Sequence, residues 1–207
     1  MKLFLFGGAK KGEVEKFLGF IEDIFNDLDV KEILHIPFAR TGLSDPAWAG
    51  NWFHRSIRLN KAQYFNAKNK EDILRVKNPL IFISGGNKDT RLLKKIKEDK
   101  VLLNLIKNAK YIVAESSGAK ILAEYVRLRY GQDNPKLMRG LGVVKNMVIE
   151  PHYLEKSRQE LLKSEMRETG FKYGLGIDSM SGIEFELDNF PQEYRKLGNG
   201  LIEIIEN

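Results

Sequence analysis

The sequence contains no cysteine among its 207 residues. Disulfides, thiolate nucleophiles and thiolate metal sites are therefore excluded, and a cytoplasmic location is the default expectation. The chain also lacks an apolar run approaching the roughly 18 residues that a membrane span requires. The short apolar segment at its N-terminus has no small-residue cleavage site of the kind that follows a signal peptide. We expect a first strand there and no membrane partner.

Long tracts of one charge are absent too, although the net charge is +6 and the pI is near 9.3. The lysines are dispersed among acidic residues, and the one short basic cluster, Lys94 to Lys97, has the spacing of a solvated helix face. We therefore expect no nucleic-acid partner, whereas a small anionic substrate is compatible with the charge. No repeat, low-complexity tract or Pro/Gly-rich linker interrupts the chain, so we expect a single domain over residues 1–207 that is a monomer or a homodimer.

Short apolar runs rich in β-branched and aromatic residues alternate with stretches of helical periodicity. In the first helical stretch, Val14, Leu18, Ile21 and Phe25 recur at the three- and four-residue spacing of one helix face. We expect strands at 2–7, 32–38, 63–66, 79–84, 110–114, 142–150, 174–177, 182–186 and 201–205. We expect helices at 13–28, 90–99, 117–129 and 155–169.

Fully apolar strands separated by helices predict an α/β fold, with a mainly parallel sheet covered by helices on both faces. The hairpin-like signals after residue 170 indicate some antiparallel strands at one edge. In open parallel sheets, functional residues gather in the loops just beyond the carboxyl ends of the strands. Three such turns contain candidate site residues.

The first turn is Ser84-Gly85-Gly86-Asn87, at the end of an apolar strand. Its two glycines allow backbone N–H groups to approach a ligand closely, as an oxyanion or phosphate site requires. The alternative is a tight strand-to-helix turn without a ligand. The spacing matches neither a Walker A motif nor a dinucleotide fingerprint, so phosphate binding has little support.

The second turn lies in the stretch "YIVAESSGAKILAEY", where an apolar strand meets two serines and a glycine. A nucleophile elbow places serine on a strained strand-to-helix turn, with small residues two positions before and two after it. Ser116, between Ala114 and Gly118, satisfies this requirement better than Ser117, which follows Glu115 by two positions. The alternative is that either serine merely caps the helix that follows.

The third turn contains His152, which follows a proline at the end of an apolar run. A histidine at a strand's carboxyl end, downstream of an elbow serine, is well placed to act as its general base. The other two histidines are His35, within the second expected strand, and His54, in a stretch with helical character. No histidine pair or Asp/His cluster has the spacing of a metal site.

These turns, in this order, resemble the serine peptidases of the peptidase E (aspartyl dipeptidase) and cyanophycinase group. The matching segments are "IPFA" (36–39), "SGGN" (84–87), "ESSGAK" (115–120), "EPHY" (150–153) and "SRQELL" (157–162). Together they span about residues 33 to 165, which is most of the chain. The resemblance implies a three-layer fold like that of class I glutamine amidotransferases (flavodoxin-like), with a nucleophile elbow and without a metal or cofactor.

The resemblance also implies the roles of individual residues. Ser116 would be the nucleophile and His152 its general base, and the triad acid would be Asp133 or, as a competitor, Asp178. The oxyanion would be held by the backbone N–H groups of Gly85, Gly86 and Ser117. Asn87 and Arg158 would contact the substrate, Arg158 by binding a carboxylate. The alternative for Arg158 is an ordinary position on the surface of a helix.

The sequence departs from the family pattern around the elbow. Ala114 replaces glycine, Glu115 replaces a bulky neutral residue, and Ser117 replaces alanine, while Ser84 replaces the first glycine of the glycine turn. A carboxylate beside the nucleophile could raise the pKa of the histidine or repel an acidic substrate. The leading prediction is a serine peptidase that hydrolyses small peptides through an acyl-enzyme, with N-terminal Asp-X dipeptides as candidate substrates. The alternative is a catalytically impaired member of the fold that binds a small anionic ligand or a protein partner.

Overall fold

The computed structural model describes residues 1–40, 62–128 and 135–207. The helices in these ranges are α1 (Val14–Asp27), α3 (Lys70–Arg75), α4 (Asp89–Glu98), α5 (Lys100–Lys107), α6 (Ser117–Lys120) and α7 (Gln159–Thr169). The strands are β1 (Lys2–Phe6), β2 (Glu32–Ile36), β3 (Gln63–Asn66), β4 (Leu80–Ile83), β5 (Tyr111–Glu115), β6 (Tyr125–Leu128), β7 (Lys136–Arg139), β8 (Met147–Pro151), β9 (Tyr173–Ile177), β10 (Ser181–Glu186), β11 (Arg195–Gly198) and β12 (Ile202–Glu206).

The main sheet has the strand order β11-β10-β1-β5-β4-β2-β3. The five strands from β1 to β3 in this order are parallel to one another, and β10 and β11 add an antiparallel edge. The expected mainly parallel sheet with antiparallel strands at one edge is therefore confirmed. The carboxyl ends of β1, β4 and β5 lie next to one another, which brings the loops that follow them together.

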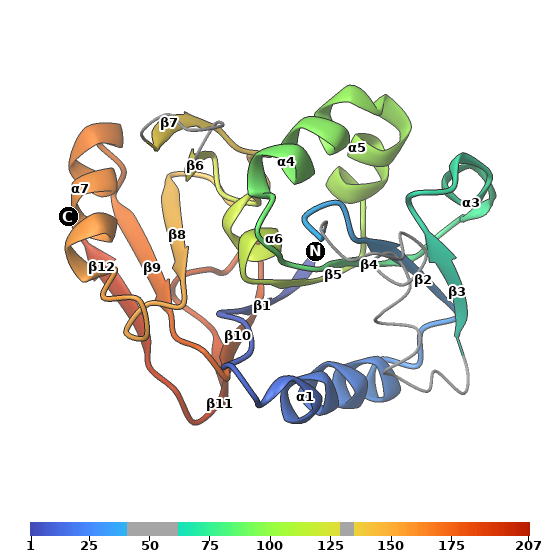
Figure 1. The fold of residues 1–207 in the computed structure, drawn as a ribbon, viewed down its shortest axis with the longest axis horizontal. Helices are drawn as coiled ribbons and strands as arrows, with labels where there is room; N and C mark the ends of the chain where they lie inside the picture. The colour runs from blue at the N-terminus through green and yellow to red at the C-terminus, as the bar shows by residue number, and fades with distance from the viewer. Residues whose placement is uncertain (41–61, 129–134) are drawn as a thin grey trace.

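Helices cover both faces of this sheet, as Figure 1 shows, with α1 on one face and α4, α5 and α6 on the other. The α1 face is packed with aromatic and aliphatic side chains, among them Phe6, Phe17 and Phe82. A larger apolar cluster fills the opposite face and continues beneath the second sheet. Strands β1, β2, β4 and β5 are buried on both sides and are therefore mainly apolar, as the sequence suggests, whereas the edge strand β3 is only partly buried.

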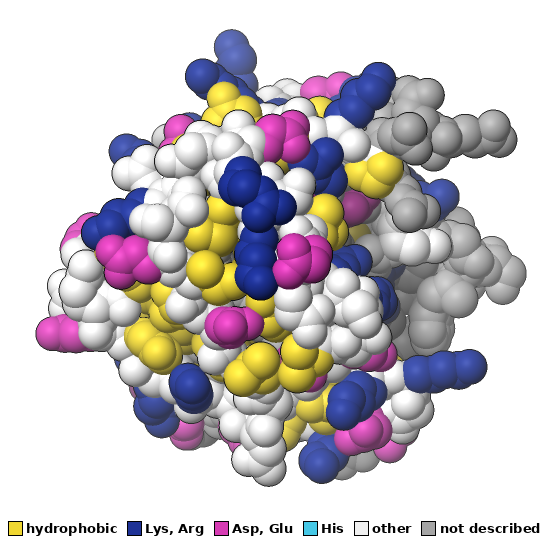
Figure 2. Space-filling view, turned by 90° about the vertical axis from the view of Figure 1, so that its left-hand side faces the viewer, with side chains coloured by type: hydrophobic (Ala, Val, Ile, Leu, Met, Phe, Trp, Pro, Cys, Tyr) yellow, Lys and Arg dark blue, Asp and Glu magenta, His cyan; other side chains and the backbone are white. Residues whose placement is uncertain are grey.

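A second, three-stranded sheet has the order β12-β9-β8 and is packed against α7. Strand β8 is parallel to β9, so the turns that follow β8 and β9 lie at the same edge of this sheet. Seen from the side that carries α7 and β12, the surface has positive and negative side chains among apolar ones, and neither sign is continuous (Figure 2). In the described ranges, no helix has both the length and the apolarity to cross a bilayer.

The expected helix at 117–129 is wrong beyond its first turn. Helix α6 ends at Lys120, and the chain then turns into β6, which pairs with β7. The carbonyls that would continue the helix accept hydrogen bonds from distant residues instead: Leu141 N–H donates to Ile121 and Val143 N–H donates to Leu122. Tertiary pairing of the segment has overridden its helical periodicity.

Two other boundaries differ from the sequence prediction by four residues or more. The expected strand at 142–150 is confined to β8, and the expected helix at 155–169 begins four residues later, at Gln159. The chain from His152 to Arg158 is a turn in which Arg158 N–H donates to the Tyr153 carbonyl and Ser157 has a φ of 49°. The site depends on this turn, because it orients both His152 and Glu155.

Candidate active site

Ser116 occupies a sharp turn between β5 and α6. Its φ of 52° and ψ of −121° lie in a region that non-glycine residues rarely adopt. The Ser116 N–H is held by the Phe6 carbonyl at 2.9 Å, and the backbone of Ile83 packs so closely against Gly118 that a Cβ there would collide with it. The geometry matches the strained strand-to-helix turn of a nucleophile elbow, and the Ser116 side chain caps no helical N–H.

His152 follows β8 directly and also has a left-handed φ, of 52°. Its Nε2 lies 3.0 Å from Ser116 Oγ, within hydrogen-bond distance. The imidazole is largely buried, with 13% of its side-chain surface exposed. Burial lowers the pKa of His152, because the charged imidazolium loses solvation, so the neutral ring dominates near neutral pH. A neutral imidazole within reach of a serine hydroxyl is the arrangement that a general base requires.

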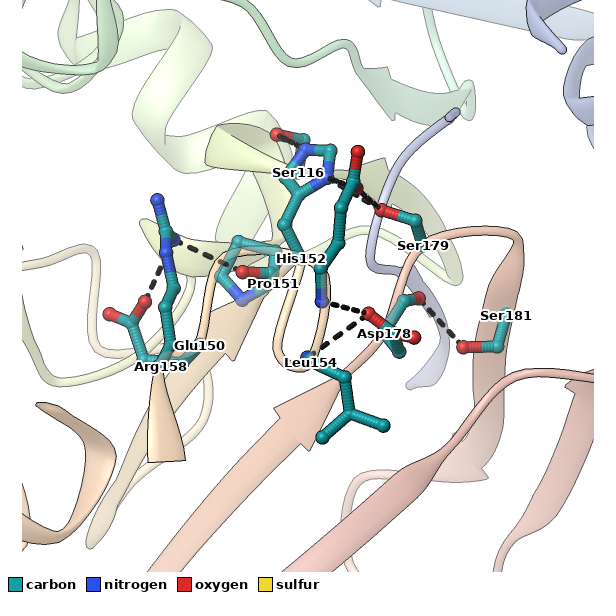
Figure 3. Close-up of polar contacts among 10 residues, drawn as sticks. Ser116, Glu150, Pro151, His152, Leu154, Arg158, Asp178, Ser179 and Ser181 are labelled. Carbon is teal, nitrogen blue, oxygen red and sulfur yellow. Dashed lines mark hydrogen bonds and ion pairs between the residues drawn. The ribbon is translucent and has the colours of Figure 1, made fainter. Parts of the chain in front are cut away.

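The other ring nitrogen of His152 faces Ser179, as Figure 3 shows, and it also contacts Glu155. Nδ1 lies 2.9 Å from Glu155 Oε2 and 2.7 Å from Ser179 Oγ, and the Ser179 hydroxyl donates to the same carboxylate oxygen. Because an ionised carboxylate only accepts hydrogen bonds, this contact assigns the ring proton to Nδ1. The lone pair on Nε2 is then directed at the hydroxyl of Ser116. The hydrogen bond from Ser179, followed by the one from His152, lowers the pKa of Glu155 and keeps it ionised.

Asp178, one of the two aspartates named from the sequence, does not contact the His152 ring, whose Nδ1 faces Glu155 and Ser179 instead. Asp178 accepts hydrogen bonds from the N–H groups of Leu154 and Glu155, at 3.1 and 3.0 Å, and so supports the turn that carries the histidine. Asp133 lies outside the described residues, as does His54. Glu155 and Ser179 were missed from the sequence. Glu155 lies three residues after His152, and Ser179 directly follows Asp178, so both lie beside positions that the sequence did indicate.

Gly8, in the loop after β1, is a further site residue that the sequence did not indicate. A Cβ built on it would lie 2.9 Å from Nε2 of His152 and 3.1 Å from Cβ of Ser116. Its φ is +109°, a value that other residues rarely adopt. The absence of a side chain at Gly8 thus leaves room for the serine and the histidine to meet.

The glycine turn lies beside the nucleophile, but two of its predicted oxyanion donors are already bonded. Gly85 N–H donates to Glu115 Oε1 at 2.7 Å, and Gly86 N–H donates to Ser117 Oγ at 3.1 Å. The same Glu115 oxygen lies 3.0 Å from Arg40 Nη2. By contrast, the N–H of Ser117 at the start of α6 donates to no other described residue. The role of Glu115 in this structure is therefore to join the elbow to the glycine turn.

Ser84 and His35 form a buried polar contact under the same turn. The Ser84 hydroxyl lies 2.9 Å from Nε2 of His35, and Nδ1 of His35 lies 2.6 Å from the Tyr64 hydroxyl. Burial lowers the pKa of His35 well below its usual value, so the ring is neutral. The departure from glycine at position 84 thus supplies a hydrogen-bond partner to a buried histidine.

Arg158, a predicted substrate contact, is paired with a buried glutamate. Its Nη1 lies 2.8 Å from Glu150 Oε2 and 3.1 Å from the Pro151 carbonyl oxygen (Figure 3). Glu150 also forms an ion pair with Lys120. These contacts attach the start of α7 to the end of β8 and leave a quarter of the Arg158 side chain exposed. Asn87, the other predicted contact, is exposed in the loop before α4.

The comparisons with known proteins agree with this geometry. The family model described as peptidase family S51 matches residues 3–191. The chain belongs to peptidase family S51. It is therefore a serine peptidase, and the predicted family resemblance and enzyme class are confirmed.

Two solved structures share the fold. A candidate peptidase E protein from Listeria monocytogenes EGD-e superposes with a TM-score of 0.61 at 21% identity, covering 96% of this chain and 98% of its own. A peptidase from an acI-B1 Actinobacterium gives a TM-score of 0.57 at 18% identity, covering 100% of this chain and 96% of its own. These likenesses confirm the predicted α/β fold of the peptidase E type. The comparison with curated proteins returned no match.

Proposed function

We propose that this S51 peptidase hydrolyses small peptides with Ser116 as its nucleophile and His152 as its general base. The observation that carries the proposal is the 3.0 Å contact between Ser116 Oγ and His152 Nε2 at a serine with a φ of 52°. Ser116 meets the requirements for nucleophilic catalysis: it sits on a strained turn, next to a base whose proton position is defined.

The reaction then follows from the positions of these groups. As Ser116 Oγ attacks the peptide carbonyl carbon, His152 Nε2 takes the hydroxyl proton and the carbonyl oxygen becomes an oxyanion. The tetrahedral intermediate collapses, the C–N bond breaks, and the imidazolium gives its proton to the departing amine. Water, deprotonated by His152, next attacks the acyl-enzyme; the bond from the acyl carbon to Ser116 Oγ then breaks, the imidazolium returns the proton to Ser116 Oγ, and the acid product leaves.

We assign the third position of the triad to Glu155, with Ser179 as its bridge. The Glu155 carboxylate stabilises the imidazolium that forms during the attack, and together with Ser179 it fixes the ring so that Nε2 faces the nucleophile. One third of the Glu155 side chain is exposed, so solvent screens part of its charge. We assign to Asp178 a supporting role, since it holds the N–H groups of the turn rather than the ring.

The oxyanion is held, in this proposal, by the backbone N–H groups of Ser117 and Gly85, which lie on the two sides of the nucleophile. A Cβ on Gly85 would lie 2.6 Å from Cβ of Ser116, which shows how closely the glycine turn approaches. The start of α6 adds its orphan N–H groups on the other side. Gly86 ties the glycine turn to the elbow through Ser117 Oγ.

Substrate choice is tested with a dipeptide panel, in which Asp-Leu, Asn-Leu and Leu-Leu differ only in charge and shape at the first residue. The Asp-X prediction rests on the family resemblance and requires preferential cleavage of Asp-Leu. Ser116→Ala should abolish hydrolysis of every peptide that the wild type cleaves. Ser164→Ala, in the middle of α7, is the matched control and should cleave as the wild type does. Retained hydrolysis in Ser116→Ala would contradict the proposal.

A further inference from the structure

The Glu115 carboxylate occupies a backbone donor, the Gly85 N–H, that we assign to the oxyanion. Its Oε1 accepts the Gly85 N–H at 2.7 Å, and its side chain is almost fully buried, with 5% of its surface exposed. The charged acceptor and short distance make this a strong hydrogen bond. Gly85 lies beside the nucleophile, since a Cβ built on it would be 2.6 Å from Ser116 Cβ.

An oxyanion and the Glu115 carboxylate compete for the same N–H. The Gly85 N–H points in one direction, so it cannot serve both acceptors at full strength. The two groups also carry the same charge, and because the Glu115 side chain is buried, solvent screens their repulsion poorly and the repulsion opposes formation of the tetrahedral intermediate. The contact that orders the glycine turn before substrate binds therefore opposes its catalytic use.

Arg40 gives the carboxylate an anchor that does not depend on Gly85. Arg40 Nη2 lies 3.0 Å from the same Glu115 oxygen, and about a third of the Arg40 side chain is exposed. The carboxylate can therefore leave the Gly85 N–H while its charge stays paired with the guanidinium. The Glu115 side chain can thus take two arrangements, one bonded to Gly85 and one held by Arg40 alone. The first blocks the Gly85 N–H and the second leaves it available to an oxyanion.

We propose that Glu115 is an internal brake on this peptidase, occupying the Gly85 donor until the oxyanion of a bound substrate displaces it. The proposal rests on the assignment of Ser116 and His152 made above. It identifies Glu115 as the residue that limits how often the donor is available, and it makes removal of the carboxylate an activating change.

The test measures the second-order rate of phosphonylation by a fluorophosphonate probe, whose phosphoryl oxygen enters the oxyanion site during attack. Losing one oxyanion donor typically costs about 100- to 1,000-fold in kcat. Freeing a partly blocked donor should therefore accelerate labelling by about tenfold or more, and by no more than a whole donor contributes. Glu115→Ala removes both the charge and the acceptor, whereas Glu115→Gln keeps the shape and removes only the charge. The expected order of rates is wild type, then Glu115→Gln, then Glu115→Ala.

The matched control is Glu32→Gln. Glu32 also accepts two backbone N–H groups, those of Lys77 and Asn78 at 3.0 Å each, but it lies at the amino end of β2, away from the nucleophile. This variant should label at the wild-type rate. If Glu115→Ala is folded and labels no faster than the wild type, the brake is disproved. If Glu115→Ala does not fold, Glu115→Gln decides, and an unchanged or slower rate overturns the proposal.

Failure of the brake and failure of the proposed function give different results. If neither the wild type nor either Glu115 variant labels at Ser116, the nucleophile assignment itself is wrong. If the wild type labels at Ser116 and the variants do not label faster, only the brake is wrong. A crystal structure of the phosphonylated enzyme adds a direct readout. We expect the phosphonyl oxygen on Gly85 N–H with Glu115 displaced, and an intact Glu115–Gly85 contact in that adduct would contradict the proposal.

Discussion

Replacing Glu155 by glutamine tests how His152 is oriented. The substitution keeps the size of the side chain but replaces a carboxylate oxygen by an amide that can donate to Nδ1. The ring can then adopt the other tautomer, with its proton on Nε2, where it can no longer accept the proton of Ser116. In chymotrypsin-like enzymes the corresponding loss costs about 10,000-fold in kcat.

The effect here should be smaller, for two structural reasons. Ser179 remains at 2.7 Å from Nδ1 and can still hold the ring, and one third of the Glu155 side chain is exposed to screening solvent. We therefore expect a fall in kcat of about 100-fold, or about 2.7 kcal/mol of transition-state stabilisation. Ser179→Ala alone should cost less, and the double variant should reveal coupling between the two.

The pH profile separates this electrostatic role from a purely structural one. Burial lowers the pKa of His152, while the Glu155 hydrogen bond and charge raise it. Removing the charge disfavours the imidazolium, so the pKa should fall further and the acidic limb of kcat/KM should move to lower pH. The assay is peptide hydrolysis across this limb for the wild type and Glu155→Gln. A fall in kcat below threefold, or an acidic limb that stays in place, would show that the Glu155 carboxylate does not stabilise the His152 imidazolium.

Two further substitutions test packing and burial. Gly8→Ala should reduce kcat/KM by at least about tenfold, because its Cβ would lie 2.9 Å from the His152 ring. Gly12→Ala is the control for backbone strain alone, because Gly12 also has a positive φ but faces open space. Equal activity in the two variants would contradict the clash. Burial and the neighbouring Glu150 raise the pKa of Glu165, in α7, to about 8. Between about pH 4.5 and 8 the folded state therefore keeps a proton on Glu165 that the unfolded state has lost. The free energy of unfolding should fall as pH rises through this range. Glu165→Gln should flatten that fall in urea unfolding, and an unchanged pH dependence would show that Glu165 is not its source.

The elements that the sequence predicts best are those whose pattern reflects burial. Helix α1 follows from its three- and four-residue apolar spacing, and the parallel strands follow from their apolar runs, because both patterns record which faces are buried. The helix expected at 117–129 fails because Leu122 and its neighbours pair with a segment about twenty residues away. Periodicity within one segment contains no information on such a partner.

The same distinction applies to the site. The positions of Ser116 and His152 at the ends of apolar strands could be predicted from local patterns, whereas the roles of nucleophile and base were implied by the family resemblance. Glu155 and Ser179 could not be predicted, because their roles arise from a turn conformation that brings two loops together, 24 residues apart. The contact between Glu115 and Gly85 likewise depends on adjacent strands β4 and β5, and sequence order alone does not show where the carboxylate ends.

The most direct test of the central assignment is mapping of the covalent adduct after treatment with a fluorophosphonate probe. Digestion and mass spectrometry should place the added mass on Ser116, and the adduct should be lost in Ser116→Ala and strongly reduced in His152→Ala, because the hydroxyl then has no base. An adduct on Ser117 or Ser179, or labelling of Ser116 that does not depend on His152, would contradict the account.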